Sequence, residues 1–321
     1  MPLKSVISRR RLLGSGAALG LVGLATPYVS RGNAAAGTLV IRTLGGAYEE
    51  AANNVYFKPF TEETGIEIQL LPTNFSKLLA MHRSGSSEID VIDIGEIGVL
   101  QLGREGGLAP IAYDGWKNVN VDDIDEAAVA EFGVGHTYYS TVIGYNTEAI
   151  SPDKAPKSWA DFWDADAFPG PRMLADIASG SLDLEQALIA DGVKVEDLYP
   201  IDVPRALNSF KRIRPHIRKF WDTGALSAQM LTDQEAVMGS IWNTRLQAAV
   251  DSGAPLGIEW NGGMLNMQSW SIAANSRNIE NAQRFVEFAV APERQAALCA
   301  LIPNGPTNKR SFEHIAPDRA A

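Results

Sequence analysis

The residues best placed to bind a polar molecule lie where predicted strands end. Gly45, Gly46 and Tyr48 follow a predicted strand at residues 38–43 and open a predicted helix. Backbone N–H groups at such a turn can receive a polar or anionic group, although a plain tight turn would have the same sequence. Glu96 follows the third predicted strand at the same edge, where it could bind a ligand or simply favour a helix N-terminus.

A second group of candidates lies further along the chain. Trp242 ends a predicted strand and could pack either on a ligand or in the core. Arg245 lies one helical turn beyond Trp242, from where its guanidinium could enter the same cleft. Asp176 lies near Ser179 and Ser181 at a predicted helix start, so helix capping explains it at least as well as ligand binding.

No set of residues has the spacing that catalysis or metal binding requires. The sequence contains no G-x-S-x-G elbow, no H-E-x-x-H and no phosphate-binding P-loop. The four histidines are scattered without metal-ligand spacing: His82, His136, His216 and His314. We therefore expect a binding protein with no cofactor and no metal. A secreted enzyme built on the same elements is the first alternative.

The N-terminal segment has the three parts of an export signal. Basic residues precede an apolar, Gly/Ala-rich run at residues 12–25, and small residues follow at 34–36. Ser8–Leu13, with sequence SRRRLL, fits the twin-arginine pattern. The run is shorter than the roughly 20 apolar residues of a transmembrane helix. We expect a signal at residues 1–36, cleavage near Ala36, and a mature protein in the periplasm.

Composition predicts an acidic protein of two domains. Residues 1–36 hold five basic and no acidic residues, so 28 Lys and Arg against 38 Asp and Glu become 23 against 38, a net charge of −15. This charge argues against nucleic-acid binding. Subtracting 36 from 321 leaves 285 residues, enough for two cores. Cys299, the only cysteine, cannot form an intramolecular disulfide and is expected to be buried.

The elements that must position the candidates alternate along the chain. β-branched runs and amphipathic helices follow one another, the pattern of an α/β protein with helices on both faces of its sheets. No Gly/Ser/Pro-rich linker separates the two halves, so we expect extended strands at residues 141–146 and 269–274 to cross between them. A hinged cleft would result. Strands are also predicted at residues 38–43, 66–71, 89–94, 172–176, 216–220, 236–242, 256–260 and 267–273.

Several segments together resemble the spermidine/putrescine-type periplasmic solute-binding proteins of ABC transporters, within the extracellular solute-binding family 1-like group. These segments span nearly the whole mature chain: residues 60–66, 158–163, 241–243, 271–276 and 304–308. The resemblance implies the type II periplasmic binding protein fold, two α/β lobes joined by two crossover strands with a ligand cleft between them. It also implies delivery of a small polar solute to ABC permease and ATPase subunits at the membrane.

The resemblance also suggests limits for the parts of the chain. Residues 37–143 and 271–302 would form lobe 1, residues 144–270 lobe 2, and residues 303–321 a C-terminal tail. We expect a monomer that binds no nucleic acid. A ligand-presenting sensor module, which would serve a receptor rather than a permease, is the second alternative.

Further site residues come from the resemblance alone. Positions that correspond to ligand-contacting segments of the family are Trp221, Asp222, Thr223, Trp242 and Asn243. The family has a Trp-x-Asp whose carboxylate binds an amine, and the corresponding positions here are Asn266 and Gln268. Losing that carboxylate while gaining Arg245 disfavours a polycation and suits a ligand with a carboxylate. Polyamine-like, amino-acid-derived and opine-like ligands all stay open.

Overall fold

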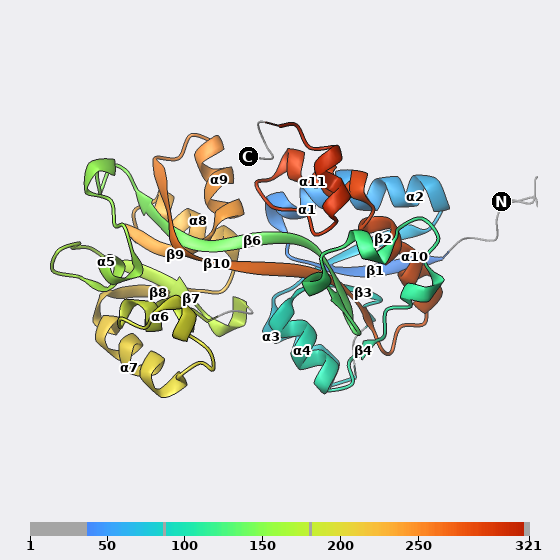
Figure 1. Ribbon diagram of the computed structural model, residues 1–321, viewed down its shortest axis with the longest axis horizontal. Coiled ribbons are helices and arrows are strands. Elements are labelled where there is room, and N and C mark those ends of the chain that lie inside the picture. Colours follow the sequence, from blue (N-terminus) through green and yellow to red (C-terminus); the bar gives the residue numbers. More distant parts are fainter. Residues whose placement is uncertain (1–36, 86–87, 180–181, 318–321) are drawn as a thin grey trace, which may run out of the picture. The chain divides into compact units, whose positions relative to one another are not determined.

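The computed structural model describes residues 37–85, 88–179 and 182–317. The predicted export signal lies outside these residues. A sheet in the strand order β2-β1-β3-β10-β6-β9-β7-β8 runs through the described chain (Figure 1). Its strands on this path are β1 (Thr38–Thr43), β2 (Glu67–Pro72), β3 (Val91–Gly95), β6 (Gly133–Asn146), β7 (Arg172–Ala175), β8 (Ile217–Trp221), β9 (Met238–Trp242) and β10 (Leu256–Ala273).

Two long antiparallel strands connect the two halves of the sheet. β10 pairs with β3 over Gln268–Ile272, while β6 pairs with β9 over Thr141–Tyr145, and β6 and β10 pair with each other. β1 pairs in parallel with β2 and β3 in one half, and β7 pairs in parallel with β8 and β9 in the other. The predicted two-lobed α/β fold with two crossover strands is therefore confirmed. The first lobe contains β1–β3, and the second contains β7–β9.

The crossover strands are longer than predicted. The predicted strands at 256–260 and 267–273 are parts of the single strand β10, whose pairing with β6 is irregular between Glu259 and Met264. The residues Asn261-Gly262-Gly263 between them are typical of a turn, and Gly262 has a φ of +71° in the structure. In the structure this irregularity is a bulge that the ladder spans, because a bulge adds residues to one strand without ending its pairing.

Helices cover both faces of each half of the sheet (Figure 1). In the first lobe they are α1 (Gly46–Ala52), α2 (Lys58–Thr64), α3 (Phe75–Arg83), α4 (Glu96–Arg104), α10 (Ile279–Ala289) and α11 (Pro292–Leu301). In the second lobe they are α5 (Trp159–Trp163), α6 (Leu184–Ala190), α7 (Val203–Ile213), α8 (Gly224–Thr232) and α9 (Asn243–Asp251).

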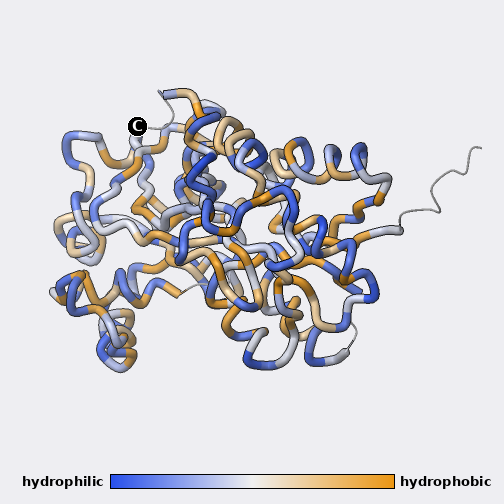
Figure 2. Tube along the Cα trace, turned by 45° about the vertical axis from the view of Figure 1, so that its right-hand side comes forward, coloured by the Kyte–Doolittle hydropathy of each residue, from blue (hydrophilic) through white to orange (hydrophobic). Residues whose placement is uncertain are grey.

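Alternation along the central strands gives each face its own core. Val91 packs with the cluster under α1, α2, α10 and α11, whereas its neighbour Ile92 packs with the cluster under α3 and α4. Val142 and Ile143 divide in the same way between the two cores of the second lobe. Successive strand side chains point to opposite faces, so strands buried on both faces are apolar at nearly every position. Figure 2 shows this apolar interior beneath more polar helices.

Local signals in the sequence set several helix ends. α2 ends at Gly65, whose φ of +72° is the left-handed conformation that glycine adopts at low cost. Ser158 begins α5, and its hydroxyl accepts a hydrogen bond from the Asp161 N–H at 3.1 Å. The helix predicted to open near Tyr48 is present, and it consists of α1, a π-helical segment at Asn53–Phe57, and α2.

The described residues contain no helix long and apolar enough to cross a membrane. The segment after Pro303 is bonded to the rest of the chain, because the Tyr138 N–H donates to the Gly305 carbonyl at 2.7 Å. The proposed residue limits of the lobes and of the tail stay predictions.

Candidate functional site

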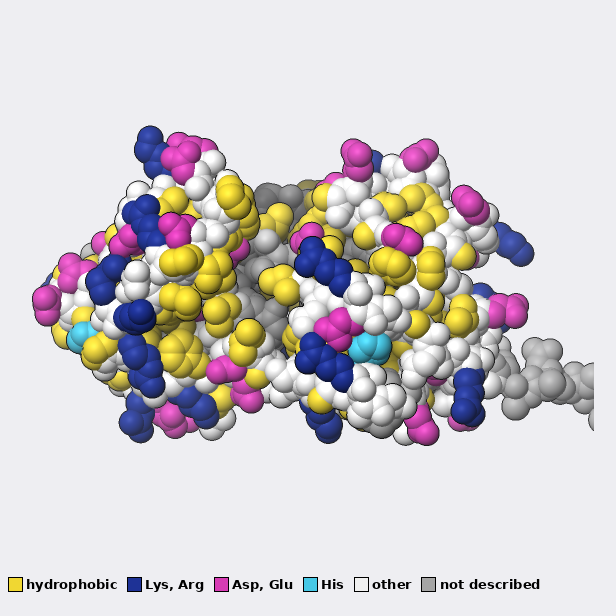
Figure 3. Space-filling view, turned by 90° about the horizontal axis from the view of Figure 1, so that it is seen from below, with side chains coloured by type: hydrophobic (Ala, Val, Ile, Leu, Met, Phe, Trp, Pro, Cys, Tyr) yellow, Lys and Arg dark blue, Asp and Glu magenta, His cyan; other side chains and the backbone are white. Residues whose placement is uncertain are grey.

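A cavity of about 70 Å³ lies where elements of the two lobes meet. β1 and α1 contribute Arg42 and Tyr48 to its wall, and the second lobe contributes Trp242 and Arg245. This volume has room for about half a dozen waters, which matches a small solute. Figure 3 shows a furrow between the lobes, with exposed hydrophobic residues on α4 and α7.

Four of the predicted site residues line this cavity. They are Tyr48, Trp242, Arg245 and Gln268. Trp242 packs edge-on against the ring of Tyr139, another wall residue, with ring centroids 5.9 Å apart. Trp221 also packs edge-on against Trp242, with ring centroids 5.1 Å apart. Trp221 is fully buried, and its Nε1 donates to the Ser240 carbonyl at 2.8 Å.

Gly45 and Gly46 hold the guanidinium of Arg245. The carbonyl of Gly45 accepts a hydrogen bond from Arg245 Nη2 at 3.2 Å, which joins the two lobes. Gly45 and Gly46 have φ values of +68° and +66°, and a Cβ on Gly46 would lie 3.1 Å from Arg245 Nη1. Only glycine provides both this backbone conformation and this close approach at low cost.

A third glycine makes room on the other side of Arg245. A Cβ on Gly224, at the start of α8, would lie 2.8 Å from Arg245 Cγ and 2.9 Å from the Trp242 ring. Burial lowers the pKa of Arg245, and the neighbouring Tyr48 opposes this effect. Among the described residues, no carboxylate forms an ion pair with Arg245. The cavity wall therefore carries a half-buried positive charge without a counter-charge.

Arg42, the second arginine of the cavity wall, is more deeply buried than Arg245 and has other partners. Arg42 is 2 % exposed and donates through Nε to the Thr73 carbonyl at 3.0 Å and through Nη1 to the Asp93 carbonyl. Burial lowers the pKa of Arg42 to about 10, and the negative charge of Asp93 opposes this shift. The negative charge of Asp93 therefore offsets part of the cost of burying Arg42.

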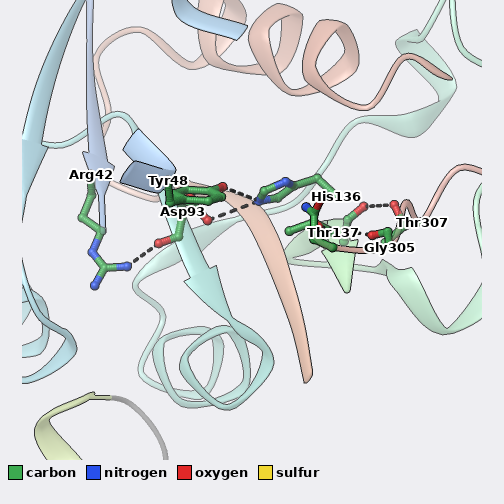
Figure 4. Close-up of polar contacts among 9 residues, drawn as sticks. Arg42, Tyr48, Asp93, His136, Thr137, Gly305 and Thr307 are labelled. Carbon is green, nitrogen blue, oxygen red and sulfur yellow. Dashed lines mark hydrogen bonds and ion pairs between the residues drawn. The ribbon is translucent and has the colours of Figure 1, made fainter. Parts of the chain in front are cut away.

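Asp93 also fixes the Tyr48 side chain (Figure 4). The Tyr48 hydroxyl donates to Asp93 Oδ2 at 2.7 Å, and His136 Nε2 lies 3.2 Å from Asp93 Oδ1. Burial, followed by the charge of Asp93, raises the pKa of Tyr48 well above its usual value. His136 is fully buried and stacks on Trp270, with ring centroids 4.4 Å apart. The phenol at the cavity is thus held protonated, in one orientation.

A neutral polar cluster forms another part of the wall. Gln268 lies opposite Thr137 in the β10–β6 ladder, and Asn304 Nδ2 donates to the Thr137 hydroxyl. That hydroxyl lies 3.2 Å from the Gly305 carbonyl. Thr137, Gln268 and Asn304 all line the cavity.

The other predicted site residues are exposed or make contacts within the protein. Glu96 is exposed at the start of α4, and Asp176 Oδ1 accepts from the Ala178 N–H at 2.8 Å in a turn. Thr223 caps α8 by accepting from the Leu226 N–H at 3.3 Å, next to the exposed Asp222.

Asn243 and Asn266 bond within the protein near the cavity. Asn243 accepts from the Ser140 N–H at 2.9 Å and donates to the Pro303 carbonyl at 2.7 Å. Asn266 donates to the Thr141 hydroxyl at 3.1 Å and to the Met264 carbonyl at 2.9 Å. Neither lines the cavity, and their direct contact with a ligand stays a prediction, as it does for Glu96, Asp176, Asp222 and Thr223.

The sequence analysis missed several polar wall residues. They are Arg42, Thr137, Tyr139, Thr244 and Asn304. A charged residue inside an otherwise apolar strand was the available signal for Arg42.

The described residues hold no group of His, Cys, Asp and Glu suited to a metal ion.

Comparisons with known proteins agree with this architecture. The family model described as "Bacterial extracellular solute-binding protein" matches residues 55–320. The gamma-aminobutyric acid-binding protein of Pseudomonas aeruginosa is 33% identical, over 91% of this chain and 82% of its own length. The spermidine/putrescine-binding periplasmic protein of Escherichia coli is 25% identical, over 91% and 88%. The PBP AgtB from Agrobacterium tumefaciens R10, in complex with agropinic acid, has a TM-score of 0.80 and 29% identity, over 88% and 87%.

Proposed function

We propose, from the premise that this chain belongs to the bacterial extracellular solute-binding protein family, that its solute carries a carboxylate and that Arg245 binds it. The protein is a substrate-binding component of an ABC importer and captures a small polar solute. The proposal concerns the chemical class of that solute and the residues that recognise it.

The unbalanced charge of Arg245 carries this proposal. Both arginines donate to backbone carbonyls, but the negative charge of Asp93 acts on Arg42, whereas no carboxylate among the described residues forms an ion pair with Arg245. A guanidinium can donate two parallel hydrogen bonds to a carboxylate, and such charge-assisted pairs are strong and directional. A carboxylate at Arg245 would neutralise the buried charge.

The same wall disfavours polyamines. Among the described residues, no aspartate or glutamate lines the cavity, and its charged wall residues are two arginines. A polycation would lose its hydration and face like charges, which opposes binding. The names of the relatives support this choice, since gamma-aminobutyric acid and agropinic acid carry carboxylates and spermidine and putrescine do not.

Aromatic groups would cover the carbon chain of the solute. Tyr139 and Trp242 present their rings at the cavity, and Phe75 and Leu44 add apolar surface. Small-solute sites commonly combine such apolar walls with a few polar groups that fix orientation. Each buried CH₂ contributes about 0.8 kcal/mol.

We further propose how the protein works in the cell. It would be exported by the twin-arginine route, act as a monomer in the periplasm, and deliver its solute unchanged to permease and ATPase subunits. A turnover screen with the best ligand separates this from the enzyme alternative, because a binding protein returns the solute intact.

Calorimetric titration tests the assignment of the carboxylate. We expect gamma-aminobutyrate or agropinic acid to bind and spermidine and putrescine to bind weakly or not at all. Arg245→Ala should weaken carboxylate binding by about 2 to 5 kcal/mol, or roughly 30-fold to several-thousand-fold in Kd. Arg245→Lys should lose less, because it keeps the charge. Tight spermidine binding by the unmodified protein, or unchanged carboxylate affinity in Arg245→Ala, would refute the proposal.

A further inference from the structure

We propose that the solute carries a second polar group that is neutral, a hydroxyl or an amide, and that Thr137, Gln268 and Asn304 select it over an ammonium. This inference rests on the proposed function, because it describes the rest of a molecule whose carboxylate lies at Arg245. It would distinguish hydroxylated or lactam-type acids from simple amino acids.

The three residues form one continuous polar surface at the cavity. Gln268 and Thr137 are direct partners in the β10–β6 ladder, where facing side chains lie close together. Asn304 reaches the same Thr137 hydroxyl from the segment after α11. A ligand group in contact with one of these side chains is therefore within reach of the others.

This surface holds two buried polar atoms with unmet hydrogen-bonding capacity. Gln268 Nε2 and Asn304 Oδ1 have no hydrogen-bond partner among the described residues, and Gln268 is 4 % exposed. Buried polar atoms are nearly always paired in native proteins, so such exceptions require an explanation. A ligand group that fills the cavity would supply both partners.

One atom is a donor and the other is an acceptor, and this restricts the chemistry of the partner. A carboxylate can only accept, and an ammonium can only donate, whereas a hydroxyl or an amide does both. The Thr137 hydroxyl donates to the Gly305 carbonyl and accepts from Asn304 Nδ2, which leaves Asn304 Oδ1 as an acceptor without a partner. With Gln268 Nε2 as the donor, a single hydroxyl or amide of the ligand satisfies both atoms.

Charge supports the same conclusion. An ammonium at this surface would lose its hydration, and no aspartate or glutamate among the described residues lines the cavity to offset that loss by an ion pair. Asp93 is fully buried, lies behind Tyr48, and is bonded to Tyr48 and His136. Its charge also acts on the buried Arg42. A neutral ligand group has no such requirement.

Matched pairs of acids test the inference. The probes are amino and hydroxy acids of three to five carbons, such as 4-aminobutyrate and 4-hydroxybutyrate, which differ only in the terminal group. In the unmodified protein we expect the hydroxy acid of the best-fitting pair to bind at least tenfold more tightly by calorimetry. Equal affinities, or tighter binding of the amino acid, would overturn the inference while leaving the proposed carboxylate site intact. Binding of none of the six acids would overturn both.

An isosteric variant tests the residues themselves. Gln268→Glu introduces a carboxylate of the same shape and should reverse the order, so that the amino acid binds more tightly. Gln229→Glu makes the same change at an exposed position on α8 and should leave the order unchanged. A Gln268→Glu protein that keeps the order of the unmodified protein would overturn the assignment. If that variant does not fold, Asn304→Asp is used for the same comparison.

Discussion

The contact between Arg245 and the two glycines of the first lobe can be tested by adding one methyl group. In Gly46→Ala the new Cβ would lie 3.1 Å from Arg245 Nη1, which is closer than ordinary van der Waals contact. The guanidinium must then move by a few tenths of an ångström. Its hydrogen bond to the Gly45 carbonyl is already 3.2 Å long, so this shift would weaken it.

The size of the effect follows from the bond that is lost. A hydrogen bond that involves a charged group contributes about 1.5 to 3 kcal/mol, so its weakening should lower the affinity for a carboxylate ligand by at most roughly 10- to 150-fold. Gly46→Ala also places alanine at a positive φ, which costs about 1 to 2 kcal/mol of folding stability and would lower the Tm. That cost must be separated from the effect on Arg245.

Gly106→Ala provides the matched control. Gly106 has a φ of +69°, close to that of Gly46, and a Cβ there would meet no atom within 4 Å. Both variants should lose similar stability in thermal unfolding, but only Gly46→Ala should lose affinity in calorimetric titration with gamma-aminobutyrate or the best acid found. Equal affinities for the two variants would refute the role given to the glycine pair.

Three further predictions concern other parts of the molecule. Ligand should close the lobes and reduce the radius of gyration in small-angle scattering, and an unchanged radius at saturation would contradict the hinge. Changing Arg9 and Arg10 together to Lys should leave the precursor in the cytoplasm, whereas normal processing would exclude the twin-arginine route. Burial raises the pKa of Asp183 from 3.8 to about 6. The folded state therefore binds this proton more readily than the unfolded state, and acidification from pH 7 to about pH 4.5 should raise this group's contribution to the free energy of unfolding by about 2 kcal/mol. Urea unfolding at both pH values should show this difference between the unmodified protein and Asp183→Asn, and an equal pH dependence in the two proteins would contradict it.

Much of the fold could be predicted because it depends on local patterns. Alternating apolar strands and helices indicated an α/β protein, and the absence of a flexible linker indicated crossover strands. The continuity of β10 was not predictable in the same way, since Asn261-Gly262-Gly263 forms a turn in many proteins. In the structure the residues on either side, Glu259 and Met264, both pair with β6, so the strand continues past this segment.

The cavity was predicted less completely because its wall comes from distant segments. Thr137 and Asn304 are 167 positions apart in sequence, and no local pattern connects them. Gly45 and Gly46 were predicted to form a turn that either receives a ligand group through its N–H groups or is a plain tight turn. The structure adds a contact that neither alternative contained, because the Gly45 carbonyl accepts from Arg245, about 200 residues away in the sequence.

The path of the chain through the two lobes also determines when each can be completed during synthesis. The largest core of the first lobe joins Leu39 and Tyr56 to Phe285 and Leu298, so residues from both ends of the described chain share it. The strands β7, β8 and β9 and their helices come from the intervening segment. A growing chain can therefore assemble much of the second lobe first, while the apolar face of β1 stays uncovered until α10 and α11 have been made. Loss of α10 and α11 would leave that face uncovered, so a small deletion near the C-terminus would affect the part of the molecule that is made first.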